Sequence, residues 1–95
     1  MLRRFKISGH SMSPTLKDGW HVITEKITYL FRAPKIGDII TFKSKISDKV
    51  LIKRIVGIGR SGKIKVAGDN PADSLDSRIF GLVDRTDIIG RLIVL

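Results

Sequence analysis

Three serines crowd into the nine residues Ser8–Leu16, which read SGHSMSPTL, and a serine hydroxyl can act as a nucleophile. Ser11 stands just ahead of Ser13-Pro14, a pair typical of the first turn of a helix, and Gly19 is an early stop signal. The first N–H groups of such a turn lack internal partners and can stabilise an oxyanion beside the hydroxyl. The alternative is that all three serines only satisfy backbone groups in a polar turn.

A nucleophilic serine needs a base, and the chain offers histidine and lysine for that role. His10 is adjacent to Ser11 in the sequence, so it is poorly placed to reach the same hydroxyl. His21 would need an orienting carboxylate, and no spacing supports Asp69 or Asp76 for that purpose. Lysine remains, because burial disfavours the charged ammonium and can lower its pKa until the amine accepts a proton.

Lys53 is the lysine that the strand pattern marks. It lies in the apolar run Val50–Ile58, and neighbouring residues of a strand point to opposite faces. Leu51 and Ile55 share the face of Lys53, while Arg54 lies on the other apolar face, so at least one cation is expected against covered surface. Lysine can be neutralised and arginine cannot, which makes Lys53 a candidate general base. The alternative is that both side chains reach water from an edge strand.

The elements that position these residues are predicted to be strands, because short runs rich in Ile and Val recur between Gly, Pro and Asp turn signals. The runs are His21–Thr24, Asp38–Phe42, Val50–Ile58, Ile64–Ala67, Ile79–Val83 and Ile88–Leu95. This spacing predicts an all-β fold, which we take as a single domain over residues 1–95. Helix signals are limited to one short turn after Ser11, and the pattern leaves Lys26–Arg32 undecided between strand, short helix and loop.

Composition excludes several classes of protein. The chain has 95 residues, 42% of them hydrophobic and 28% charged, which argues against disorder. It has no cysteine, so disulfides, thiolate metal sites and a cysteine nucleophile are excluded, and we expect neither a metal nor a cofactor. No apolar run approaches the roughly 18–20 residues that cross a bilayer, and no signal peptide is visible. We therefore expect a chain without a transmembrane segment, cytoplasmic or peripheral to a membrane.

The net charge of +9 is unevenly distributed. Residues 1–65 hold fifteen Lys and Arg against four Asp and Glu, a net +11, and residues 66–95 hold three against five, a net −2. This balance favours an anionic partner and leaves open a non-catalytic basic β-module that binds nucleic acid or a membrane surface. No block of five like charges occurs and the aromatic residues do not interleave with the basic ones, so no specific nucleic acid partner is expected.

Four sequence motifs follow one another along the chain, and their order is informative. They are Ser11–Leu16 (SMSPTL), Ile36–Phe42 (IGDIITF), Ile52–Gly57 (IKRIVG) and Gly68–Arg78 (GDNPADSLDSR). Together they resemble the motifs of the S26 serine peptidases, the type I signal peptidases and their relatives. The resemblance implies a coiled all-β fold of antiparallel sheets. It also implies hydrolysis of a protein or peptide, bound as an extended strand, through an acyl-enzyme and usually after small residues.

The resemblance also assigns roles. Ser11 would be the nucleophile and Lys53 the general base of a Ser-Lys dyad that removes an N-terminal leader or signal peptide. Gly9 stands where many bacterial members carry an oxyanion-donating serine, so the oxyanion would rest on backbone N–H groups, chiefly that of Ser11. Met12, next to the nucleophile, is a candidate for substrate contact.

The last motif would support the site. By resemblance, Ser74 orients the lysine, and Asp76 pairs with Arg78 to hold the loop beneath the site. Asp69 and Asn70 would shape the turn that leads into it.

The chain also departs from the larger members of the family. Only ten residues precede Ser11, and only a short connection, Gly59–Gly62, follows the lysine strand, so neither a membrane span nor an accessory β-domain is expected. This compact form is similar to the small branch that includes nickel-type superoxide dismutase maturation proteases. Signal peptide cleavage is the rival within the family, and a self-cleaving repressor would need an upstream cleavage site that residues 1–10 do not provide. Trp20, Met12 and Phe31 are expected to be exposed, which would allow peripheral contact with a membrane.

Overall fold

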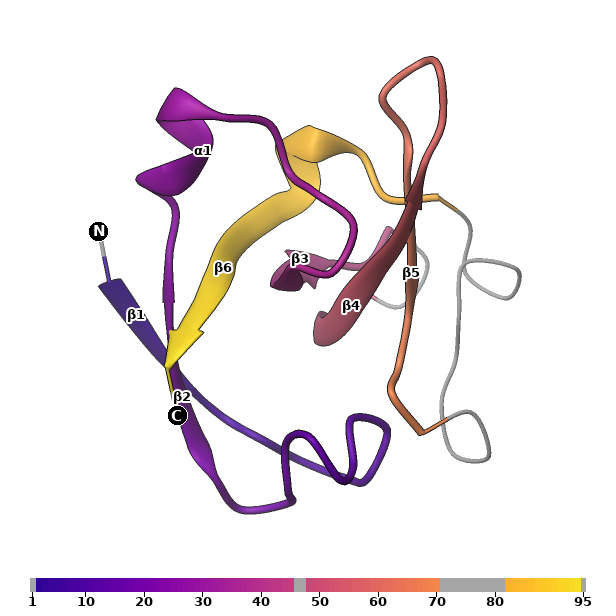
Figure 1. Cartoon of the computed structure of the whole chain (residues 1–95). Coiled ribbons are helices and arrows are strands. Elements are labelled where there is room, and N and C mark those ends of the chain that lie inside the picture. The colour runs from indigo at the N-terminus through magenta and orange to yellow at the C-terminus, as the bar shows by residue number, and fades with distance from the viewer. Residues whose placement is uncertain (1, 46–47, 71–81, 95) are drawn as a thin grey trace.

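Six β-strands form one sheet in the order β1-β2-β6-β3-β4-β5, and every neighbouring pair is antiparallel (Figure 1). The strands are β1 (Leu2–Lys6), β2 (His21–Glu25), β3 (Ile39–Lys43), β4 (Val50–Ile58), β5 (Ile64–Ala67) and β6 (Ile88–Val94). This computed structural model describes residues 2–45, 48–70 and 82–94. Within those ranges, helix is limited to α1 (Thr28–Phe31) and the single 3-10 turn η2 (Arg85–Asp87). The predicted all-β class is confirmed.

Strands β2 to β6 coincide with predicted apolar runs to within one residue at either end. The predicted run Ile79–Val83 lies mostly outside the described residues, and its last residue, Val83, forms a single bridge with Ile64. Strand β1 was not predicted, because it lies at the edge of the sheet and exposes Arg3, Arg4 and Lys6 where a buried strand would carry apolar residues. The undecided segment Lys26–Arg32 contains α1.

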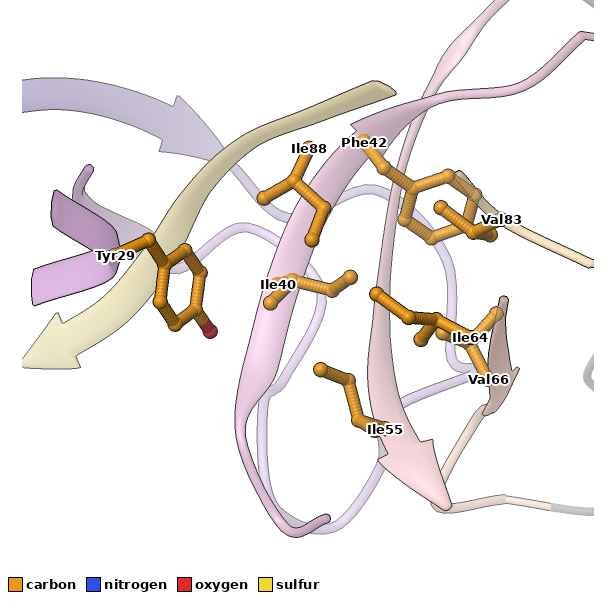
Figure 2. Close-up of a cluster of buried hydrophobic side chains, with 8 residues drawn as sticks. All are labelled: Tyr29, Ile40, Phe42, Ile55, Ile64, Val66, Val83 and Ile88. Atoms are coloured by element: carbon orange, nitrogen blue, oxygen red, sulfur yellow. The ribbon is translucent and has the colours of Figure 1, made fainter. Parts of the chain in front are cut away.

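The core has two parts, because β3 is buried on both faces. Ile40 and Phe42 of β3 face one cluster, while Ile39 faces the other, as alternation along a strand requires. The first cluster packs side chains of β3, β4, β5 and β6 with Tyr29 of α1 (Figure 2). The second contains Ile7, Met12, Leu16, Val22 and Ile39. The segment after β1 is therefore fixed to the sheet by its own apolar side chains.

The segment after the nucleophile, predicted as one short helical turn, forms hydrogen-bonded turns without a regular helix. Residues 11–16 make consecutive turns, closed by hydrogen bonds from Ser13 N to the His10 carbonyl (3.0 Å) and from Leu16 N to the Met12 carbonyl (2.9 Å). The Ser13-Pro14 peptide bond is cis. Because no helix is assigned between β1 and β2, Ser13 does not cap one, but the segment still reverses the chain as the sequence predicted.

Candidate functional site

Lys53 lies in the interior of the molecule on β4. Its side chain is 4% exposed, and across the ladder it faces Ile40 of β3. On its own strand it lies between Ile55, which belongs to the first core cluster, and Leu51, which packs against that cluster. Of the two arrangements left open for this cation, the structure has the buried one. Desolvation in such surroundings disfavours the charged ammonium, which is the property that a lysine base requires.

Ser11 lies on the turn between β1 and β2, and its residue is half-buried. Its two apolar neighbours in the motif, Met12 and Leu16, are each 1% exposed and fix the turn to the core. Gly9 has φ of +89°, a conformation that L side chains rarely adopt, and its N–H donates to the Asp18 carboxylate at 2.8 Å. The turn is thus fixed at both ends.

Ser11 and Lys53 line the same groove, although 42 positions separate them in the sequence. The groove has a volume of about 130 Å³. One wall is the end of β1 and the residues after it, numbers 5 to 8, and the other is the first half of β4, numbers 50 to 53, with Thr41 also lining it. Because β1 and β4 are not neighbours in the sheet, only its coiling brings these two walls together.

Asn70 holds the turn that carries Ser11. Its backbone N–H donates to the Ser11 carbonyl at 2.8 Å, and its side-chain amide donates to the His10 carbonyl at 3.1 Å. Asn70 follows β5 by three residues, so a hydrogen-bonded link runs from the far edge of the sheet to the turn. Asn70, which was expected to shape the turn that leads into the site, thus makes direct contact with the backbone of Ser11.

Asp69 joins the same turn to β4. Its carboxylate accepts two hydrogen bonds from Arg54, Nε to Oδ1 and Nη2 to Oδ2, both 2.8 Å, and Arg54 also donates to the Gly37 carbonyl at 2.9 Å. The Arg54 guanidinium lowers the pKa of Asp69, and a hydrogen bond from Thr15 adds to this effect. Since Arg54 adjoins Lys53 in the sequence, this fork connects the candidate base to the turn of the candidate nucleophile.

Thr41 is a groove residue that the sequence analysis did not single out. It is 1% exposed, and its hydroxyl has no hydrogen-bond partner among the described residues. The available signal was a lone hydroxyl within Ile39–Phe42, a strand otherwise made of Ile and Phe. A buried hydroxyl without a partner carries a free-energy cost, so its presence beside the groove needs an explanation.

The other expected site residues have varied positions. Met12 was expected to be exposed, which is wrong, because packing into the second core cluster is what anchors the turn. His10 and His21 are exposed and do not line the groove. The supporting residues expected at Ser74, Asp76 and Arg78 lie outside the described residues.

Among the residues described, no group of three or more His, Cys, Asp or Glu side chains could hold a metal ion.

The sequence of the whole chain matches one family model. The model for "Signal peptidase, peptidase S26" matches residues 1–59 and 60–95. This chain belongs to the S26 family. The motifs that indicated the resemblance therefore reflect a match over the full length.

Curated relatives of this family member include bacterial and plant proteins. "Signal peptidase I" of Leptolyngbya laminosa is 30% identical over 93% of the chain and 65% of the relative. "Signal peptidase I U" of Bacillus subtilis is 39% identical over 90% of the chain and 71% of the relative. "Thylakoidal processing peptidase 1, chloroplastic" of Arabidopsis thaliana is 30% identical over 90% of the chain and 39% of the relative. The S26 chain spans about 60 to 65% of the length of the first curated relatives that it matches.

In the part of this S26 chain that the structure describes, no helix has the length and apolar character needed to cross a bilayer.

Proposed function

We propose that this chain is a serine endopeptidase in which Ser11 is the nucleophile and Lys53 is the general base. The observation that carries the proposal is the common groove, which a half-buried serine and a buried lysine both line. Residues 1–95 would then form one catalytic domain. Its substrate would be a protein or peptide from which it removes an N-terminal leader or signal peptide.

The reaction uses these two side chains, the substrate and one water molecule. Neutral Lys53 takes the proton of the Ser11 hydroxyl as the oxygen attacks the scissile carbonyl carbon. The C–N bond then breaks, the ammonium of Lys53 gives its proton to the leaving amine, and an ester to Ser11 remains. Water then attacks the ester carbonyl while neutral Lys53 accepts a water proton. The bond between the acyl carbon and the Ser11 oxygen breaks, and the Lys53 ammonium returns the proton to that oxygen, which releases the acid and restores the free enzyme. Burial at 4% exposure favours the neutral amine that both steps require.

The oxyanion of each step would be stabilised by backbone N–H groups. The N–H of Ser11 has no hydrogen-bond acceptor among the described residues, so it is available to a substrate. The N–H of Gly9 is already bound by Asp18, so Gly9 would contribute through its backbone conformation. Ser74 as the group that orients Lys53, and Asp76 with Arg78 beneath the site, remain proposals from family resemblance.

The groove suits an extended substrate peptide with a small residue just before the scissile bond. Strand β5 pairs with β4 only from Arg54 onward, so Val50, Leu51 and Ile52 have no partner in β5. Residues 5 to 8 supply the opposite wall, so a substrate strand can add between two backbone edges. A groove of about 130 Å³ can receive a small side chain of the substrate beside Ser11. The preference for cleavage after small residues is proposed from the family resemblance.

The direct test is cleavage of an extended peptide with small residues before the scissile bond, followed by mass spectrometry of the products. Ser11→Ala and Lys53→Arg should both abolish cleavage, because arginine stays protonated and cannot act as the base. Ser13→Ala, in the same turn, and Lys65→Arg, exposed on β5, are the matched controls and should remain active. Cleavage by Ser11→Ala at the wild-type rate would disprove the proposal.

The pH dependence of the reaction gives a second test. Because Lys53 must be neutral to accept the proton, activity should fall on acidification. A rate that stays constant down to about pH 5 would contradict a lysine base. Salt-sensitive DNA binding by a chain that cleaves no peptide would instead favour the basic binding module.

A further inference from the structure

The groove that Ser11 and Lys53 share carries positive charge that the catalytic proposal does not use. Lys6 lines one wall, and Lys49 directly precedes Val50, the first groove residue on the other wall. Both of these lysines are exposed, and neither forms an ion pair with a described residue. The described lining residues of the groove include no Asp or Glu.

Strand β1 extends the positive wall beyond Lys6. Arg3 and Arg4 are exposed on this strand, and the Arg3 guanidinium lies 5.3 Å from the centre of the Phe5 ring, which lines the groove. Neither arginine has an ion-pair partner in the described part of the chain. Cations gathered along one cleft raise the local concentration of an acidic ligand.

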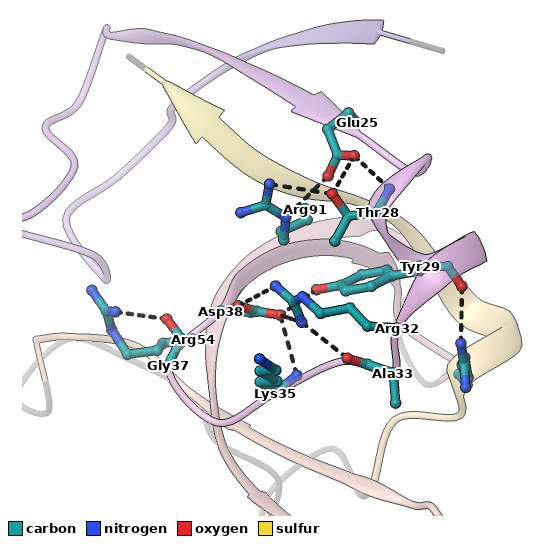
Figure 3. Close-up of polar contacts among 11 residues, drawn as sticks. Glu25, Thr28, Tyr29, Arg32, Ala33, Lys35, Gly37, Asp38, Arg54 and Arg91 are labelled. Carbon is teal, nitrogen blue, oxygen red and sulfur yellow. Dashed lines mark hydrogen bonds and ion pairs between the residues drawn. The ribbon is translucent and has the colours of Figure 1, made fainter.

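The described carboxylates are committed elsewhere. Glu25 pairs with Arg91 at 3.0 Å and Asp38 with Arg32 at 3.1 Å, and both carboxylates also accept hydrogen bonds from α1 (Figure 3). Asp18 has no ion pair among the described residues, but its carboxylate accepts a backbone N–H and does not line the groove. The other acidic residues that the structure describes are all ion-paired, namely Asp48, Asp69, Asp84 and Asp87. The charge of the groove is therefore left for a ligand to balance.

The spacing along β4 separates this charge from the reacting groups. Val50 precedes Lys53 by three positions, which corresponds to about 10 Å in an extended strand. Val50 is 47% exposed and Lys53 is 4% exposed, so the groove opens to solvent toward Val50 and Lys49. An extended peptide beside this strand covers the same length with three of its own residues. A peptide residue three or four positions from the one at Ser11 thus reaches the lysines.

We propose that the groove selects substrates that carry acidic residues three and four positions before the small residue at the scissile bond. The inference rests on the proposed function, because the groove there receives the residue before the scissile bond, and the preceding residues then follow β4 toward Val50. The ammonium groups of Lys6 and Lys49 donate charge-assisted hydrogen bonds to the substrate carboxylates. The same two cations repel a substrate that is basic at these positions, so attraction and repulsion both contribute to the selection.

Three peptides of equal length test the proposal on the full chain. All have Ala before the scissile bond; one carries Glu and one carries Gln at three and four positions before this Ala. The wild type should cleave the Glu peptide with a kcat/KM about fivefold higher, the size expected for exposed ion pairs. The gain should lie in KM, because the carboxylates are bound equally in the ground state and the transition state. The third peptide carries its Glu pair after the scissile bond and should behave as the Gln peptide.

Variants assign the preference to the two lysines. Lys6→Gln/Lys49→Gln should bring the Glu-to-Gln ratio of kcat/KM close to one, and Lys6→Glu/Lys49→Glu should invert it. Lys65→Gln, which removes an exposed lysine on β5 outside the groove lining, is the matched control and should keep the wild-type ratio. Salt at about 0.5 M should reduce that ratio, because exposed charges are screened.

Three results would overturn the selection. The first is an unchanged ratio in Lys6→Gln/Lys49→Gln. The second is a loss of activity in that variant that is equal for the Glu and Gln peptides, which would show that the lysines act on the reaction in general. The third is a wild-type preference that arises only when the Glu pair follows the scissile bond.

The preference can also be measured without catalysis, which separates it from the peptidase proposal. Ser11→Ala should bind the Glu peptide about fivefold more tightly than the Gln peptide in fluorescence anisotropy titrations, although it cleaves neither. That binding preference, together with a wild type that cleaves no peptide, would disprove the peptidase alone. Equal cleavage of both peptides by the wild type and equal binding by Ser11→Ala would disprove the charge selection alone.

Discussion

The backbone N–H of Asn70 donates to the carbonyl of Ser11 at 2.8 Å, which ties the candidate nucleophile to the turn after β5. The side-chain amide of the same residue binds the His10 carbonyl at 3.1 Å. A serine on a turn without a helix has few intrinsic constraints, so its position depends on bonds of this kind.

Asn70→Ala removes the bond to His10 and leaves the backbone bond to Ser11. If Asn70 positions the nucleophile, kcat for peptide cleavage should fall about tenfold with little change in KM, because substrate binding uses the groove walls. The free energy of unfolding should fall by about 1 kcal/mol, the usual effect of one lost hydrogen bond. Steady-state kinetics and urea unfolding measure the two effects. Unchanged kcat alongside reduced stability would show a role in folding alone.

The fork between Arg54 and Asp69 is the second target. Arg54→Lys keeps the positive charge but cannot reproduce two parallel bonds of 2.8 Å, so kcat should fall several-fold while KM changes little. Arg60→Lys, at an exposed position in the loop after β4, is the matched control and should behave as the wild type. A double-mutant cycle between Arg54→Ala and Asp69→Ala should give a coupling of about 1 kcal/mol in unfolding free energy. If the effects of the two single substitutions on the unfolding free energy simply add, the interaction between the two side chains does not stabilise the fold.

Thr41→Val should stabilise the protein. The variant replaces a buried hydroxyl that lacks a partner among the described residues with a methyl group, which removes a desolvation cost. We expect the free energy of unfolding to rise by about 1 kcal/mol in urea titrations. Thr41→Ser keeps the hydroxyl and removes a buried methyl group, so it should destabilise. A less stable Thr41→Val would reveal that the hydroxyl is satisfied by water.

Acid should destabilise the fold through Asp38, Glu25 and Asp69. Burial works to raise the pKa of Asp38, but the hydrogen bonds from Arg32 and Tyr29 outweigh it and lower that pKa. Burial also opposes the lowered pKa of Glu25, where the bonds from Thr28 and Arg91 prevail. A carboxylate whose pKa is lower in the folded state stabilises the fold at pH values above its unfolded-state pKa, which is 3.8 for Asp38 and 4.5 for Glu25. That stabilisation is lost as the pH falls through the folded-state pKa.

Unfolding by urea at a series of pH values measures this loss. The free energy of unfolding should be nearly constant between about pH 7 and pH 5 and should fall steadily below about pH 4. Asp38→Asn should be less stable than the wild type at pH 7 and should show a shallower decline in acid. Asp48→Asn, which alters an exposed carboxylate in the β3–β4 loop, is the control. An identical acid profile for the wild type and Asp38→Asn would exclude Asp38 as a source of the dependence.

The sequence by itself predicted five of the six strands and the two residues that we propose as the catalytic pair. Alternation along Val50–Ile58 marked Lys53 as a cation with apolar neighbours, and the structure buries it between Leu51 and Ile55. Periodicity reports which face a residue shares, and apolar faces become buried, so this property is local. Strand β1 was not predicted, because an edge strand with charged residues shows no apolar periodicity.

Only the tertiary structure decided which of these residues meet. The common groove of Ser11 and Lys53 arises because the sheet coils until residues 5–8 approach the first half of β4, and β6 inserts between β2 and β3 to build that sheet. The burial of Met12, the hydrogen bonds of Asn70 to the Ser11 turn and the exposure of Leu30 and Phe31 likewise depend on packing between distant segments. A local pattern specifies how each segment divides its apolar and polar sides. The pairing of those sides is a property of the whole chain, because each buried face needs a partner that lies elsewhere in the sequence.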